Sequence, residues 1–289
     1  MAQLTNEQVM QIEAAVVKAA RQVMIGRRLV PTPPPVGFAQ EVLGYDKLTE
    51  MAKGRIDLEW GAGFSEDTVR LKRTKVPMAV LHREFDLNRR QVEASQRNGT
   101  PLPTTAIDAA TYAVARQEDD LIIQGYSVDG THYEIPGLYQ GAGNSDTGAD
   151  WGTATNIPVT LQEGVAKLQE DNIPGPYTLV VHPTQYNELF GLIGSYSTDM
   201  YYDYAVKRLA AVGADGVNQQ GRVFSTTAVT TATCMLLGPA FLNYAAFQLG
   251  VDMKVEVTEL EKSKNTWGIV YETGAVLLHD SNGICTLGC

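Results

Sequence analysis

REFDLNRRQVEASQRNGTPLPTTAIDAATYAVARQEDDLIIQGY, residues 83–126, predicts a long helix in its second half. We expect the hydroxyl group of Thr104 or Thr105 to cap the first turn, because it can accept a hydrogen bond from a free backbone N–H. Gly125 is expected to end the helix, since glycine readily adopts the left-handed conformation that often follows one. Between these bounds, four apolar residues recur at helical spacing and share one face: Ile107, Ala110, Val114 and Leu121.

Three acidic residues, Glu118, Asp119 and Asp120, stand together near the end of this predicted helix, and Glu118 falls on its apolar face. One hypothesis is a carboxylate pair for acid–base or metal chemistry. We favour the other, in which solvent or a nearby arginine satisfies these acids, because no His or Cys stands at ligand spacing. The candidate arginines are Arg89, Arg90 and Arg116.

Length and charge exclude several classes of protein. The chain has 289 residues, 44% of them hydrophobic, which is enough for one sizeable core or two modest ones. Its formal net charge of −10 argues against a surface built to neutralise nucleic-acid phosphates. No apolar run approaches the ~20 residues that a membrane span needs, and residues 1–14, MAQLTNEQVMQIEA, do not resemble a signal peptide. We therefore expect a cytoplasmic protein that does not bind a membrane.

The three cysteines, Cys234, Cys285 and Cys289, are an odd number in a chain without a visible export signal. Reduced thiols are the expectation for such a protein. Because Cys285 and Cys289 lie close together in sequence, a redox-dependent or intersubunit disulfide is the alternative.

The N-terminal segment predicts a helix followed by an extended arm. Residues 5–8, Thr-Asn-Glu-Gln, match a capping box. Gly26 is expected to end the helix, and the proline cluster in PTPPPVG, residues 31–37, forces an extended path. The helix carries a narrow apolar stripe that must be buried against another part of the chain, a neighbouring subunit or a partner. Its members are Val9, Ile12, Val16, Ala19 and Val23.

Residues 46–81 predict a projecting ribbon of two strands. The alternation is clean over residues 68–75, where Val69 and Leu71 fall on one face and charged residues on the other. Because an isolated pair of strands is only marginally stable in water, we interpret the ribbon as a loop that contacts a neighbouring subunit. The alternative is an ordinary hairpin that packs on its own domain.

A polar, glycine-rich connection at residues 140–156 leads into a second predicted unit. A helix with Val165 and Leu168 facing inward is broken at residues 172–176, and residues 177–181 have the apolar character of a buried strand before another helix begins. This order is an α/β pattern. Short strands are then expected at 223–224 and 234–237, and alternating runs at 252–259, 266–271 and 275–278 are expected to return beside the long helix.

Taken together, these segments resemble an encapsulin, a shell protein of the HK97-like capsid fold. Residues 4–30, LTNEQVMQIEAAVVKAARQVMIGRRLV, are similar to the N-terminal helix of that family. REFDL at residues 83–87 and the later Glu118–Asp119 pair resemble the spine helix of the family and its lead-in. The most specific match is GPYTLVVHPTQYNELF, residues 175–190, which resembles a strand and helix of the axial domain. Residues 195–220 do not align closely with encapsulins.

The resemblance implies an α+β, HK97-like fold with four parts. These are an N-terminal helix and arm at residues 1–45, an extended β-hairpin or E-loop at 46–82, a peripheral domain with a long spine helix at 83–149 and 249–289, and an axial domain at 150–248.

The resemblance also implies a function: many copies would close into an icosahedral shell, a nanocompartment that encloses a cargo enzyme. A short peptide of the cargo would bind the inner face near Ile25, Arg27 and Val30, although simple packing of the arm also accounts for these residues. The alternative is the major capsid protein of a tailed phage or related virus, which would enclose DNA within a virion. We favour the nanocompartment, because a helix that begins near Thr5 leaves little room for a scaffolding segment before it.

Neither catalysis nor a bound cofactor is predicted. The four histidines are scattered, without a triad or the HExxH and CxxC spacings of metal sites. A glycine-rich stretch at residues 141–143 precedes a polar connection rather than a helix, so it does not match a dinucleotide-binding loop. No basic stripe with interleaved aromatic residues indicates nucleic-acid binding, and only Arg21, Arg27 and Arg28 hint at a locally basic inner face.

Overall fold

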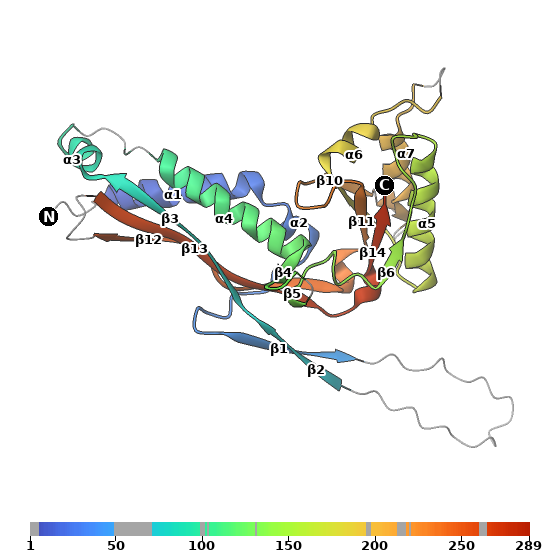
Figure 1. The fold of residues 1–289 in the computed structure, drawn as a ribbon, viewed down its shortest axis with the longest axis horizontal. Helices are drawn as coiled ribbons and strands as arrows, with labels where there is room; N and C mark the ends of the chain where they lie inside the picture. Colours follow the sequence, from blue (N-terminus) through green and yellow to red (C-terminus); the bar gives the residue numbers. More distant parts are fainter. Residues whose placement is uncertain are drawn as a thin grey trace.

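The computed structural model describes residues 6–48, 71–98, 102, 104–130, 132–194, 198–212, 218–219, 221–259 and 265–289. Within these residues the chain forms two units, each with its own cluster of buried apolar side chains. The first unit is a long, twisted sheet crossed by two helices, and the second is a smaller sheet flanked by shorter helices (Figure 1). This mixture of helix and sheet is the predicted α+β class.

The first unit is built on a three-stranded antiparallel sheet in the order β12-β13-β3. The helices α4 and α1 lie side by side along this sheet (Figure 1), and α4 packs against β3 and β13. The predicted return of the late strands beside the long helix is therefore confirmed for β13. The bounds are α1 Asn6–Val23, β3 Ala79–Asn88, α3 Arg89–Asn98, α4 Thr105–Ile123, β12 Ala245–Glu259 and β13 Asn265–Leu278.

The helix α4 is the long helix that the sequence predicts, and its apolar face is buried as expected. Its N-terminal cap differs from the prediction. Thr104 occupies the N-cap position, but its hydroxyl group makes no capping bond and instead donates to Asp108 Oδ2 at 3.2 Å. The backbone of Thr104 is already helical, with φ −93° and ψ 0°, whereas a capping side chain needs an extended backbone.

The end of α4 follows the prediction, because Gly125 has a left-handed backbone with φ +84° directly after the capping residue Gln124. A Cβ atom at Gly125 would also lie 2.3 Å from the backbone nitrogen of Gly137. Both the conformation and the close approach of a second segment therefore require glycine here. The hairpin that begins at this turn consists of β4, Gly125–Ser127, and β5, Tyr133–Pro136.

The N-terminal helix α1 packs against α4 and buries only part of the predicted stripe. Ile12 and Val16 are buried, whereas Val9 is 39% exposed. The helix ends at Val23, and Gly26 does not terminate it as expected. Gly26 instead begins a second, short helix, α2, Gly26–Leu29, which lies between the end of α1 and the proline cluster.

Beyond α2 the proline-rich arm follows an extended path along one edge of the long sheet. Phe247 N–H donates to the carbonyl of Pro31, and Val36 N–H donates to the carbonyl of Leu249. The predicted extended arm is confirmed, and its partner is the edge strand β12 of its own chain.

The predicted ribbon is present in the part that the structure describes. The strands β1, Val42–Leu48, and β2, Leu71–Pro77, pair antiparallel, and residues 49–70 lie outside the described residues. The strand pair extends away from the long sheet (Figure 1). In the described part of the pair, Tyr45 and Val76 are buried in the first core, and Leu43 packs against it.

The second unit contains a five-stranded sheet in the order β10-β7-β11-β14-β6. The predicted order of helix, break, buried strand and helix is confirmed, and both Val165 and Leu168 are fully buried. The bounds are β6 Asn144–Asp146, α5 Asn156–Glu170, β7 Thr178–Val181, α6 Pro183–Glu188, α7 Tyr201–Arg208, β8 Ala211–Val212, β9 Asn218–Gln219, β10 Arg222–Ser225, β11 Thr233–Leu237, η1 Ala240–Leu242, η2 Ser281–Gly283 and β14 Ile284–Gly288.

Two features of this sheet differ from the sequence interpretation. The polar connection at 140–156 supplies a strand, β6, which pairs with β14, and it also contains the fully buried Trp151. The last strand, β14, pairs with β11 in the second sheet, although residues 249–289 were grouped with the long helix. The domain bounds themselves stay a prediction.

Side chains that alternate along the second sheet join the two units. In β7, Leu179 and Val181 belong to the second core, while Val180 between them belongs to the first. The same alternation occurs in β11, where Leu236 faces the second core and Met235 the first. Because successive side chains of a strand point to opposite faces, one sheet serves as a wall of both cores.

All three cysteines are free and buried, as the expectation of reduced thiols requires. Burial raises the pKa of Cys285 to about 11. It also raises the pKa of Cys234, whose thiol faces that of Cys289. A thiol with a raised pKa is a poor nucleophile at neutral pH.

None of the described helices combines the length and apolar character that crossing a membrane would require.

Candidate functional site at the N-terminal arm

A cluster of charged side chains fixes the start of the arm to the first unit. Arg27 of α2 donates from Nε to Glu118 Oε1 of α4 at 2.7 Å, and from Nη2 to Glu272 Oε1 of β13 at 2.5 Å. Its Nη1 donates to Asp252 Oδ1 of β12 at 2.9 Å. One guanidinium group therefore connects the arm to three separate elements of the unit. We call these four residues the arm anchor.

The arm anchor is buried at one end and open to solvent at the other. The side chains of Glu118 and Glu272 are 0% exposed, whereas that of Asp252 is 63% exposed. Arg27, at 21%, lies between these extremes. Two carboxyl groups thus share one cation in the buried part, and no donor among the described residues bonds to Glu272 Oε2.

This imbalance shifts the protonation of the two glutamates. Burial and then the charge of Glu118 raise the pKa of Glu272 to about 9. Burial also raises the pKa of Glu118, although the hydrogen bond and charge of Arg27 act to lower it. Burial acts to lower the pKa of Arg27, but its hydrogen bond to Glu118 and the charges of both glutamates raise it. At neutral pH we expect Arg27 to be charged and the glutamate pair to hold one proton, located mainly on Glu272.

The side-chain carboxylate of Asp119, the neighbour of Glu118, binds the backbone of the same segment. It accepts hydrogen bonds from the N–H groups of Ile25, at 3.0 Å, and Gly26, at 2.7 Å. Burial raises the pKa of Asp119 to about 6 despite these bonds from Gly26 and Ile25. The close contact needs glycine at position 26, since a Cβ atom there would lie 2.6 Å from Ile122 Cδ1.

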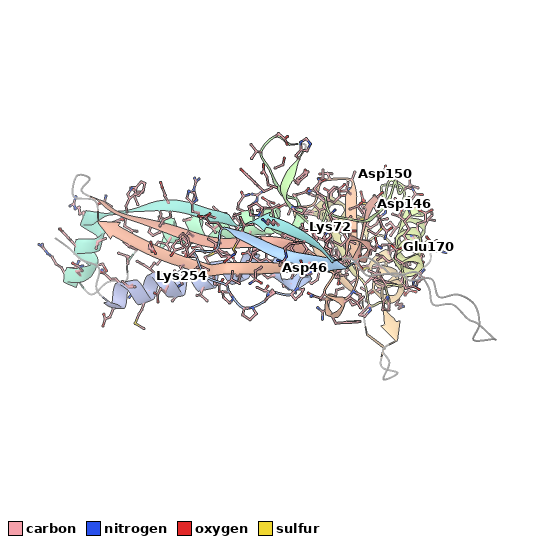
Figure 2. All side chains as sticks on the ribbon, turned by 90° about the horizontal axis from the view of Figure 1, so that it is seen from below. Asp46, Lys72, Asp146, Asp150, Glu170 and Lys254 are labelled. Carbon is pink, nitrogen blue, oxygen red and sulfur yellow. The ribbon has the colours of Figure 1, made fainter. Side chains whose placement is uncertain are left out.

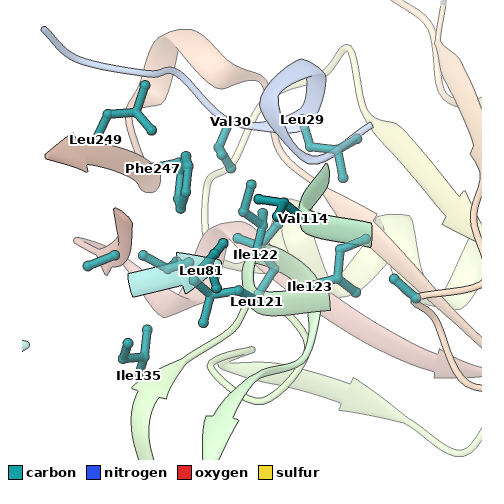
Figure 3. Close-up of a cluster of buried hydrophobic side chains, with 14 of the residues drawn as sticks. Leu29, Val30, Leu81, Val114, Leu121, Ile122, Ile123, Ile135, Phe247 and Leu249 are labelled. Carbon is teal, nitrogen blue, oxygen red and sulfur yellow. The ribbon is translucent and has the colours of Figure 1, made fainter. Parts of the chain in front are cut away.

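The three residues suggested for cargo binding lie in or beside the arm anchor. Ile25 is half-buried and packs at the edge of the first core. Arg27 is engaged by its three carboxyl groups. Val30 is only 3% exposed, and Figure 3 shows Leu29 and Val30 directed toward Val114 and Ile122 of α4. Each residue therefore has a packing role in the subunit, whatever else it binds.

One predicted arginine acts on this acidic cluster: burial raises the pKa of Asp120, and the charge of Arg116 acts to lower it. For Glu118 the predicted partners were wrong. Glu118 pairs with Arg27, which precedes it by 91 residues, rather than with Arg89, Arg90 or Arg116. The sequence interpretation also missed Glu272 and Asp252. For Glu272 a signal existed, because it is a charged residue within the otherwise apolar end of β13 and so had to be either exposed or paired.

The arrangement suits mechanical anchoring rather than chemistry. Among the residues that the structure describes, no group of three or more His, Cys, Asp or Glu side chains is placed to hold a metal ion. The buried carboxyl groups face a permanent cation and the interior of the first unit, and a buried pair of this kind costs free energy when either partner is lost.

Comparison with solved structures places this fold among capsids and virus-like particles. The virus-like particle from Pyrococcus furiosus aligns over 96% of this chain and 98% of its own, with a TM-score of 0.67 and 16% identity. Identity at that level shows the fold alone. The described fold is the HK97-like capsid fold that the sequence predicts.

Sequence comparison defines the family. The family described as "Encapsulating protein for peroxidase" matches residues 1–266. The type 1 encapsulin shell protein EncA of Myxococcus xanthus is 26% identical over 231 residues, covering 80% of this chain and 77% of that protein. A diheme-cytochrome-encapsulin shell fusion protein of Kuenenia stuttgartiensis is 25% identical over 279 residues, covering 96% and 71%.

The chain belongs to the encapsulin shell-protein family, whose members assemble in many copies into nanocompartments that enclose cargo. The alternative of a viral major capsid protein is not favoured, because the family match and both relatives are encapsulins.

Proposed function

We propose that this chain is the structural subunit of a closed icosahedral shell that encloses a cargo enzyme in the cytoplasm, and that it performs no catalysis itself. The observation that carries the proposal is the ribbon of β1 and β2, a pair of strands that extends away from the long sheet (Figure 1). Two paired strands are marginal in isolation, so contacts with neighbouring copies would complete their burial. The membership of the chain in a family of shell proteins supports the same conclusion.

We further propose that a short peptide of the cargo binds beside the arm anchor, near Ile25, Arg27 and Val30. Met253 and Val255 of β12 are half-buried, pack against the first core and follow the exposed Asp252 in sequence. Of the three residues, Ile25 is the one with both an apolar side chain and partial exposure. Val30 would act only indirectly, through the position of the arm.

The experiment that tests the shell function examines particles from the native source. Mass spectrometry and ultraviolet absorbance of purified particles would identify their contents. A folded enzyme inside a particle without nucleic acid is the expected result. Genomic DNA together with portal and tail proteins would overturn the proposal in favour of a viral coat.

Removing the tip of the ribbon should abolish assembly while leaving the subunit folded. We would replace residues 49–70 with an Asn-Gly turn, because Leu48 and Leu71 are paired and can be joined by a tight hairpin. Circular dichroism should be close to that of the wild type, whereas gel filtration and electron microscopy should show small species instead of shells. A control replaces Val128–Gly130, an exposed turn elsewhere in the subunit, with the same dipeptide. Normal shells from the ribbon variant would contradict the proposed role of the ribbon.

Replacing Ile25 by serine should reduce cargo loading without preventing assembly. The expected loss is about tenfold, since a half-buried apolar contact contributes roughly 1–1.5 kcal/mol. Densitometry of cargo and shell bands in purified particles measures the ratio. Val128→Ser, which removes an equally apolar but 73% exposed side chain, serves as the control. An equal ratio of cargo to shell protein in the two variants would contradict the assignment of Ile25 to the cargo site.

A further inference from the structure

A pocket separate from the arm anchor lies where α2 meets the second unit. Its volume is about 630 Å³, which is within the range typical of sites for small organic ligands. Its walls come from α2, from the residues before β7, from the start of β10 and from η1. The two units therefore form it jointly.

The charge of this pocket is opposite to that of the protein as a whole. Arg28 and Arg222 both line it, and no Asp or Glu stands among the described residues of its lining. Within the described part of the chain, neither arginine forms an ion pair with a carboxylate. By contrast, the chain carries a net charge of −10, and Figure 2 labels three acidic side chains of the second unit, Asp146, Asp150 and Glu170.

One of the two guanidinium groups is positioned without being neutralised. The guanidinium carbon of Arg28 lies 4.7 Å from the centre of the Phe224 ring, a cation–π contact. Phe224 belongs to β10, the strand that begins at Arg222. The aromatic ring thus restrains Arg28 near the strand that carries the second arginine while its N–H groups remain available to an acceptor.

An exposed aromatic side chain completes the lining. Phe241 of η1 is 71% exposed, although it borders the pocket. The following residue but one, Asn243, has a left-handed backbone with φ +50° and ends the short helix at this point. A ring held at the mouth of a cationic pocket can stack on the flat body of a ligand whose anionic group reaches the arginines.

We propose that this pocket binds a small aromatic anion, with its phosphate or carboxylate group on Arg28 and Arg222 and its ring against Phe241. Guanidinium groups bind both oxyanions through paired N–H donors. A ligand of mononucleotide size suits the volume of the pocket. This site is distinct from the proposed cargo site, because none of Ile25, Arg27 and Val30 lines the pocket.

Isothermal titration of assembled shells tests the proposal with four probes: AMP, adenosine, inorganic phosphate and benzoate. We expect AMP or benzoate to bind once per subunit, and the preferred probe tells whether the site takes a phosphate or a carboxylate. Adenosine, which lacks the anionic group, should bind at least tenfold more weakly than AMP if phosphate is preferred. Raising the salt concentration should weaken binding, because the recognition is electrostatic.

Variants locate the binding on the pocket. Arg222→Gln should weaken the preferred probe at least tenfold, and Phe241→Ala should weaken it severalfold. Arg116→Gln, which removes an exposed arginine of α4 outside the pocket, should leave the affinity unchanged. Electron microscopy would confirm that each variant still forms shells. The absence of binding by both AMP and benzoate, or equal affinity in Arg222→Gln and wild type, would overturn the proposal.

Discussion

Replacing Arg27 by methionine should destabilise the folded subunit by about 3–5 kcal/mol, the cost of leaving buried carboxyl groups without their cation. Methionine retains the length and apolar stem of arginine, so that packing against the arm is largely kept. What is lost is the set of bonds to Glu118, Glu272 and Asp252, the first two of which are fully buried. The midpoint of guanidinium unfolding, followed by tryptophan fluorescence, measures the change.

Two further variants separate this effect from a general loss of charge. Arg116→Met removes an exposed arginine of the same protein and should change the stability by less than about 0.5 kcal/mol. Combining Arg27→Met with Glu118→Gln and Glu272→Gln should recover part of the stability, because no buried charge then remains unpaired. A single Arg27→Met variant as stable as Arg116→Met would contradict the assigned role of the arm anchor.

The wild-type protein should become less stable between pH 6 and pH 9, and Glu272→Gln should remove much of that decline. Because the pKa of Glu272 is raised to about 9, the folded state holds a proton that the unfolded state releases above pH ~4.5. The stabilisation from this proton is fully present below the unfolded pKa and is lost as the pH rises through the folded pKa. The upper limit is ~1.4 kcal/mol per pH unit, and we expect a difference of roughly 1–3 kcal/mol over the window.

Glutamine is the suitable replacement, since it imitates a protonated glutamate in shape and hydrogen bonding. Asp119 acts in the same direction, but its raised pKa of about 6 places its effect at or below the lower end of the window. Glu134→Gln, which changes an exposed glutamate of β5, is the control and should follow the wild type. Thermal unfolding at pH 6, 7.5 and 9 provides the measurement. Parallel curves for wild type and Glu272→Gln would show that Glu272 is not protonated in the folded state.

Features that depend on neighbours in sequence could be predicted from the sequence. The apolar spacing of α4, the left-handed Gly125 at its end, and the succession of α5, β7 and α6 are all local properties, and the structure contains them. The HK97-like fold followed from resemblance across many such segments. Each of these predictions needed no knowledge of which distant segments meet.

Most of the predictions that failed concern features that depend on distant neighbours. One turn of helix at α2 is too short to be stable alone, and it forms because Asp119 accepts hydrogen bonds from the N–H groups at its start. Glu118 pairs with Arg27, 91 residues away in sequence. The strand β14 belongs to the sheet of the second unit, whereas β12 and β13, the two strands before it, belong to the sheet of the first unit. One local prediction also failed: the hydroxyl group of Thr104 makes no capping bond, because the backbone of Thr104 is already helical.

The proline arm along β12 also limits how the subunit can associate. An uncovered edge strand offers free N–H and C=O groups to any other strand and can recruit further copies into open-ended aggregates. In this subunit, Pro31 and Val36 already bond to the backbone of β12 at that edge. The arm itself cannot pair with a further strand, because proline has no backbone N–H and the cluster at residues 31–35 therefore offers few donors to another chain. Growth by strand addition is therefore blocked at this edge, which favours finite particles over fibres.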